Sequence, residues 1–127
     1  MRWLEITEEK LTEATMYFGG FSEAPSRDMT NMYMRGWCPY FALALHDLLG
    51  YQMISNGEHF AVQHGDQFID IRGFMNQNEF LDGLHGSFHP VSRNDVMNEL
   101  ESGAFKCGFF SESDLKKAIR VAKRLLK

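Results

Sequence analysis

Two alternating segments on either side of a turn restrict most strongly how this chain folds. Residues 58–64 and residues 67–72 each alternate apolar with polar side chains, and a Gly-Asp dipeptide separates them. This pattern is typical of a β-hairpin with a two-residue loop. In such a hairpin His64 pairs with Gln67, and the pairing of every other residue follows. The register is strict, because a slip of one residue would turn each side chain to the opposite face.

This register gives the hairpin two different faces. One face carries four large apolar side chains and is expected to lie in the core: Phe60, Val62, Ile69 and Ile71. The other face carries polar groups, among them His59, Asp70 and Arg72. Asp70 is expected to be the diagonal neighbour of His59 and to lie within reach of its side chain.

The strongest helix signal lies just before the hairpin, over residues 39–49. Pro39 is favoured at the first helical position, and Gly50 is placed to end the helix. The apolar stripe at helical spacing consists of Phe41, Ala42, Leu45, Leu48 and Leu49. Helix and hairpin together predict an α+β fold, in which a small antiparallel sheet packs against this helix and further helices flank it.

The remaining pattern predicts additional elements. Helices are expected at 7–18, at about 29–34, at 78–84, at 92–101 and at 112–126, a strand at 51–55, and loops over most of 19–37 and at 85–90. No repeat or linker is found, so residues 1–127 are expected to form a single domain. A chain of 127 residues with 44% hydrophobic residues can bury a core without a metal ion or a disulfide.

Charge is distributed unevenly along the chain. The net charge is −4, yet residues 111–127 hold six Lys or Arg residues against two acids. The acidic remainder is a poor binder of nucleic acid, which is therefore not expected as a partner. The basic C-terminal helix is a candidate docking surface for an acidic partner, although the solvated face of an amphipathic helix is the ordinary interpretation.

Membrane and secretion signals are weak in this sequence. No apolar run approaches the ~20 residues that a membrane span requires, and acidic residues follow the N-terminal methionine closely, unlike in a signal peptide. We therefore expect a cytoplasmic protein without a membrane partner. No cofactor and no metal are expected, because the chain has no phosphate-binding loop, dinucleotide fingerprint or zinc-finger spacing.

The two cysteines lie in different settings. Without signs of secretion, reduced thiols are expected for both. Cys107 lies in an apolar stretch that suits a small buried residue. Cys38 directly precedes the 39–49 helix, where free backbone N–H groups and the positive end of the helix dipole favour a thiolate and can receive an oxyanion. A core cysteine is the alternative interpretation of Cys38.

The hairpin supplies partners for such a nucleophile. A thiol needs a base, and the base needs a group that orients it, so we predict a triad of Cys38, His59 and Asp70. Two alternatives use the same residues: Asp70 could instead form a structural salt bridge with Arg72, or the three residues could bind zinc. His85 and His89 are alternative bases in a predicted loop.

Three segments of the chain also carry a resemblance to known enzymes. They are Gly36-Trp37-Cys38-Pro39-Tyr40-Phe41-Ala42, His59-Phe60-Ala61-Val62 and Phe68-Ile69-Asp70. They resemble papain-like and transglutaminase-like cysteine enzymes, in which a nucleophile helix packs on an antiparallel sheet that bears the histidine and its acid. The resemblance covers about residues 36–73. It implies Cys38 as nucleophile, His59 as base and Asp70 as orienting acid.

The resemblance implies thiol acyl-transfer chemistry on a protein or peptide. The activity would be that of a small hydrolase or acyltransferase acting on peptide, isopeptide or amide bonds. Papain-like members use an upstream Gln as an oxyanion donor, but this chain has no Gln before position 52, and Asn31 is the candidate substitute. The alternative function is a non-enzymatic binding or inhibitor module, of phage or microbial origin, that retains the fold.

Overall fold

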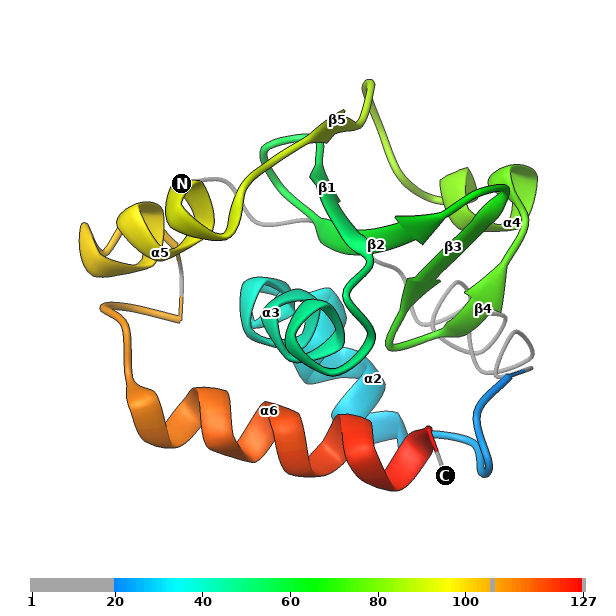
Figure 1. The fold of residues 1–127 in the computed structure, drawn as a ribbon, viewed down its shortest axis with the longest axis horizontal. Helices are drawn as coiled ribbons and strands as arrows, with labels where there is room; N and C mark the ends of the chain where they lie inside the picture. The colour runs from blue at the N-terminus through cyan, green and yellow to red at the C-terminus, as the bar shows by residue number, and fades with distance from the viewer. Residues whose placement is uncertain (1–19, 106, 127) are drawn as a thin grey trace.

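The computed structural model describes residues 20–105 and 107–126 of the chain, and over these residues the fold is α+β (Figure 1). The helix expected at 7–18 lies outside the described residues. The helices and strands are, in order, α2 (Arg27–Met34), α3 (Cys38–Leu49), β1 (Gln52–Ser55), β2 (Phe60–His64), β3 (Gln67–Asp70), β4 (Gly73–Met75), α4 (Gln77–Leu81), β5 (His89–Pro90), α5 (Arg93–Glu101) and α6 (Glu112–Leu125).

One five-stranded antiparallel sheet forms the centre of the structure. Its strand order is β4-β3-β2-β1-β5. The predicted hairpin register is confirmed, because Val62 pairs with Ile69 and His64 pairs with Gln67. Val62 and Ile69 are both fully buried, as expected for the core face.

Two short strands, β4 and β5, do not belong to the sequence-based expectation. The strand expected to continue to residue 72 ends at Asp70, and Gly73 begins β4 instead of ending the hairpin. Gly73 has a φ of 117°, a backbone conformation that glycine adopts readily. Residues 89–90 were expected to lie in a loop but pair with β1 as β5. Both strands are too short to show an alternating pattern, and Pro90 argues locally against a strand.

Helix α3 lies between the sheet and α6 (Figure 1). It begins at Cys38, with Pro39 in its first turn, and Gly50 follows it in the left-handed conformation at a φ of 73°. Because two layers cover the helix, every residue from Cys38 to Leu45 is buried, so its apolar surface extends well beyond one stripe. The predicted packing of Phe41 and Leu45 in the core is confirmed, whereas Leu48 is only partly buried.

Phe41→Ala should lower the free energy of unfolding by roughly 3–5 kcal/mol, because it opens a cavity between α3 and its neighbours. Phe41 is 2% exposed and stacks in a tilted arrangement on Tyr33. Urea denaturation at neutral pH measures the change. Phe109→Ala is the matched control, because Phe109 is 72% exposed, and it should shift stability by no more than ~0.5 kcal/mol. Equal losses in the two variants would contradict the assigned core.

The opposite face of the sheet carries a smaller apolar cluster beneath α4. Its buried members are Ile54, Ala61, Met75 and Phe80. A capping box holds the start of α4, because the Asn76 side chain accepts from the Glu79 N–H and the Glu79 carboxylate accepts from the Asn76 N–H. The polar residues of the hairpin therefore lie between the sheet and a short, firmly capped helix.

A serine precedes each of the two C-terminal helices and caps its first turn. Ser92 and Asp95 form a capping box at α5, and the Ser111 side chain accepts from the Asp114 N–H at α6. Helix α6 turns its apolar stripe inward, and its basic residues lie on the opposite side of the helix. Among the described residues, no helix combines the length and the apolar character needed to cross a membrane.

Candidate functional site

The side chains of His59 and Asp70 meet on the α4 side of the sheet. His59 directly precedes β2 and Asp70 ends β3. His59 Nε2 lies 2.8 Å from Asp70 Oδ2, and the two side chains are 0% and 2% exposed. The hydrogen bond expected from the hairpin register is therefore present.

Arg72 binds the same carboxylate. Its backbone N–H donates to Asp70 Oδ1 at 2.8 Å, its Nε lies 3.1 Å from both carboxylate oxygens, and its Nη2 donates to Oδ2 at 2.8 Å. The same guanidinium donates to the carbonyl oxygens of Phe80 and Asp82. Asp70 thus contacts both His59 and Arg72, so the salt bridge and the orienting role do not exclude each other.

These contacts determine the charge on the buried acid. Burial alone would raise the pKa of Asp70, but the Arg72 guanidinium and the His59 hydrogen bond together hold that pKa well below its usual range. Asp70 is therefore an anion at neutral pH and can only accept hydrogen bonds. It follows that Nε2 of a neutral His59 carries the proton and that Nδ1 carries the free lone pair.

The Nδ1 atom of His59 is buried without a hydrogen-bond partner. The imidazole packs against two phenyl rings, with centroid distances of 6.2 Å to Phe80 and 6.4 Å to Phe88. Burial lowers the pKa of His59, and this effect outweighs the opposing influence of Asp70. His59 is therefore a neutral imidazole at pH 7, with one nitrogen anchored and the other able to accept a proton.

Cys38 lies at the N-terminus of α3, next to the backbone that leads into His59. Its Sγ lies 3.6 Å from the carbonyl oxygen of Glu58, and the residue is 1% exposed. Burial raises the pKa of Cys38 to about 12. The structure therefore disfavours the thiolate expected from the helix terminus, because loss of solvent outweighs the helix dipole. Cys38 and His59 share no hydrogen bond; the thiol instead donates to the Glu58 carbonyl.

The other candidate residues lie at the surface. Asn31, the predicted oxyanion donor, is exposed on α2, whereas Cys38 is 1% exposed. His85 and His89 are exposed. Both cysteines are free thiols, as expected. Within the described ranges, no three His, Cys, Asp or Glu residues form a group that could hold a metal ion, which removes support for zinc on the predicted triad.

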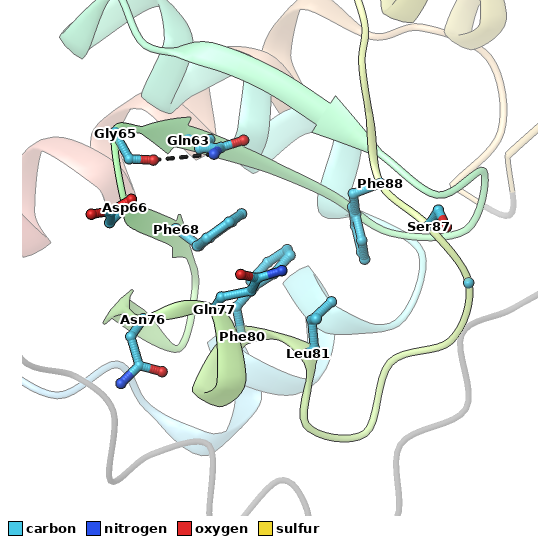
Figure 2. A pocket seen from close by; sticks show the side chains of 11 residues that line it. Gln63, Gly65, Asp66, Phe68, Asn76, Gln77, Phe80, Leu81, Ser87 and Phe88 are labelled. Atoms are coloured by element: carbon cyan, nitrogen blue, oxygen red, sulfur yellow. Dashed lines mark hydrogen bonds between the residues drawn. The ribbon is translucent and has the colours of Figure 1, made fainter.

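A pocket of about 550 Å³ opens on the α4 side of the sheet (Figure 2). It is lined by the β2–β3 hairpin and its turn, by α4, and by residues 86–88. Phe80 and Phe88 contact the His59 ring and also line this pocket. The sequence does not reveal this pocket, because its walls come from three separate segments that share no motif.

Stability should fall as the pH drops below about 6.5. The unfolded chain binds a proton at His59 near its ordinary pKa of 6.5, but burial lowers that pKa in the folded protein. Between these two values the unfolded state binds more protons, so unfolding becomes easier by up to about 1.4 kcal/mol per pH unit. Urea denaturation at about pH 7 and about pH 5.5 measures the change.

The variant His59→Gln tests whether His59 causes this pH dependence of stability. Glutamine keeps a donor for Asp70 but does not titrate, so the pH dependence should become shallower. His89→Gln is the matched control, because His89 is exposed on β5, and it should retain the wild-type dependence. An equally steep profile in His59→Gln would show that other groups cause the loss of stability.

Comparisons with protein-family models, with curated proteins and with solved structures found no match to this chain.

Proposed function

We propose that this protein is a small cysteine-dependent hydrolase or acyltransferase that acts on a peptide, isopeptide or amide bond. The observation that carries the proposal is the unpartnered Nδ1 of His59. Buried polar atoms nearly always have a hydrogen-bond partner, so an exception needs a reason. Here Nε2 is bound to an ionised acid, and Cys38 Sγ contacts the carbonyl of the preceding residue, Glu58.

The proposed reaction starts from a thiol and a neutral imidazole. His59 Nδ1 takes the Sγ proton of Cys38 while Sγ attacks the acyl carbon, and Asp70 stabilises the imidazolium that forms. The imidazolium then protonates the leaving amine, and a thioester remains on Cys38. Water or a second amine then gives a proton to His59 and attacks the thioester, and the imidazolium returns that proton to Sγ as the acyl group leaves. The backbone N–H of Cys38 at the start of α3 is the proposed oxyanion donor.

Access to the thiol is part of this proposal. Cys38 is 1% exposed, so a substrate must displace the groups that cover the thiol before Sγ can attack. Exclusion of water from such a site strengthens the interaction between imidazolium and carboxylate. The expected consequence is a reaction with small thiol reagents that is slow in absolute terms yet depends on His59, and a faster reaction with a peptide that opens the site.

Alkylation by iodoacetamide at pH 6 tests the proposal. Because burial raises the pKa of Cys38 to about 12, the fraction of thiolate at pH 6 is very small. If His59 removes the proton during attack, wild-type Cys38 should react faster than this fraction allows, and His59→Gln should abolish the excess. Mass spectrometry of the peptides separates Cys38 from Cys107, whose pKa burial raises to about 11. Cys107 is the internal control, and its rate should not change.

A second candidate function is a non-enzymatic binding or inhibitor module that keeps this fold. It is favoured by the full burial of Cys38 and by the engagement of Asp70 with Arg72, both of which suit a purely structural role. This candidate predicts slow alkylation of Cys38 that does not depend on His59. The same experiment therefore decides between the two functions.

We extend the proposal to partners and compartment. The substrate is a protein or peptide, and neither nucleic acid nor membrane is part of the function. An acidic partner could dock on α6, whose outer face carries Lys116, Lys117, Arg120, Lys123 and Arg124. Two free cysteines suit a reducing compartment such as the cytoplasm.

A further inference from the structure

The pocket on the α4 side of the sheet has a composition of its own, separate from the Cys38 side. Its volume of about 550 Å³ falls within the range of roughly 300–1,000 Å³ that is usual for small-molecule sites. Phe68, Leu81 and Phe88 are partly exposed and supply its apolar surface, whereas Phe80 beneath them is fully buried. The floor of the pocket is therefore an apolar surface built mainly from aromatic rings.

This floor is rigid because its rings are packed on one another. Phe68 and Phe80 stack with ring centroids 4.8 Å apart, and Phe88 meets Phe80 edge to face at 4.8 Å. Behind Phe80 lies the guanidinium of Arg72, which is 5.5 Å from the ring centroid and donates to the Phe80 carbonyl. A ligand on this floor meets a surface that is already ordered, which reduces the entropic cost of binding.

Polar groups surround the floor on several sides. Figure 2 shows Gln63 along one wall, Asp66 at the turn, Gln77 in front of Phe80, and Ser87 beyond Phe88. The amides and the hydroxyl can both donate and accept hydrogen bonds. Gln63 uses Nε2 to donate to the Gly65 carbonyl, and the bond orients its amide. The site therefore offers hydrogen bonds around the perimeter of a ligand rather than along one edge.

Charge limits the class of ligand further. Asp66 is the only residue with a formal charge among those that line the pocket in the described structure. Phosphates, carboxylates and sulfates would meet a carboxylate and no cation, which disfavours them. A ligand that is neutral, apolar on one ring face and rich in hydroxyls around its edge matches both floor and perimeter.

We propose that this pocket binds a neutral pyranose ring, either as a free sugar or as a unit of a saccharide. The C–H face of the sugar packs on Phe68 and Phe88, and its hydroxyls bond to Gln63, Gln77 and Asp66. A nucleobase would use the aromatic floor too, but its polar atoms lie along one or two edges and leave part of this perimeter unpaired. The site is independent of Cys38, so it stands whether or not the protein is an enzyme.

Saturation-transfer NMR on the full chain tests the proposal. The probes are the neutral methyl glycosides of glucose, galactose, mannose and N-acetylglucosamine, with glucuronic acid and adenosine as comparators. At least one neutral glycoside should receive saturation at its ring protons, and this should be equally strong in Cys38→Ser. Gln77→Ala and Gln63→Ala should each weaken binding by about three- to tenfold. Both side chains lie outside the core, so these variants should fold.

Gln67→Ala is the matched control, because Gln67 is exposed on β3 but does not line the pocket. It should bind like the wild type. Asp66→Asn should reduce the difference in affinity between glucuronic acid and the neutral glycosides. The proposal is overturned if no neutral glycoside binds, if adenosine binds in their place, or if Gln77→Ala and Gln63→Ala bind as tightly as Gln67→Ala.

Discussion

Arg72→Ala should lower the free energy of unfolding by about 3–5 kcal/mol, because it leaves the Asp70 carboxylate buried without its cation. Arg72 is 3% exposed, and it donates both to Asp70 and to the backbone at Phe80. His59 would remain as the main side-chain partner of the acid, although burial disfavours its protonation. Chemical denaturation at neutral pH measures the loss.

Arg93→Ala is the matched control for this effect. Arg93 forms an ion pair with Asp47 at 3.0 Å, but their side chains are 41% and 30% exposed. Solvent screens such pairs, so the control should lose at most about 1 kcal/mol. If both variants lost the same small amount, the buried cluster would not contribute to stability in the way described.

Arg72→Ala also separates the two roles of Asp70. If the acid orients His59, the folded molecules of Arg72→Ala should be alkylated at Cys38 at close to the wild-type rate. Asp70→Asn should instead slow the alkylation of Cys38 by orders of magnitude. If Asp70 serves Arg72 alone, the two variants should lose stability alike, and neither should change the reactivity of the thiol. The second result would leave at most a pair of Cys38 and His59 at the site.

Cys38→Ser should abolish acyl transfer with little loss of stability. The serine hydroxyl can replace the thiol as a donor to the Glu58 carbonyl, so packing changes little. An activated ester such as nitrophenyl acetate should acetylate the wild-type protein at Cys38, which mass spectrometry detects. In the serine variant the rate should fall by about 10³-fold or more, because a hydroxyl is a far weaker nucleophile than a thiol at neutral pH.

Cys107→Ser is the control for this experiment, since Cys107 is the other free thiol and is not part of the proposed triad. It should be acetylated at Cys38 as fast as the wild type. If Cys38→Ser instead destabilised the protein as much as Phe41→Ala, Cys38 would be a core residue. If acetylation were found equally at Cys107 and at Cys38, the triad would have no special reactivity.

The parts of the fold that follow from short-range pattern were predictable. A period of two and a two-residue turn determine the hairpin register, and that register alone brings Asp70 to His59. The apolar stripe and the flanking Pro39 and Gly50 likewise locate α3 to within one residue. These features depend on neighbours in sequence, which is why composition and spacing were enough.

The burial of Cys38 was not predictable in the same way. The position at a helix N-terminus determines the local electric field at the thiol. Its solvent exposure depends instead on the segment before β2, twenty residues further along the chain, where the Glu58 carbonyl contacts Sγ. The pocket shows the same limit, because Phe68 and Phe88 meet only through the tertiary fold. The strands β4 and β5 were missed for another reason, since two or three residues are too few to show a period.

The short strand β5 has a consequence for association between molecules. It is the outermost strand on the β1 side of the sheet, and half of it is Pro90. Proline has no backbone N–H to offer to an incoming strand, and two residues present almost no ladder to extend. This border of the sheet is therefore protected against edge-to-edge aggregation, although β1 beside it is largely buried.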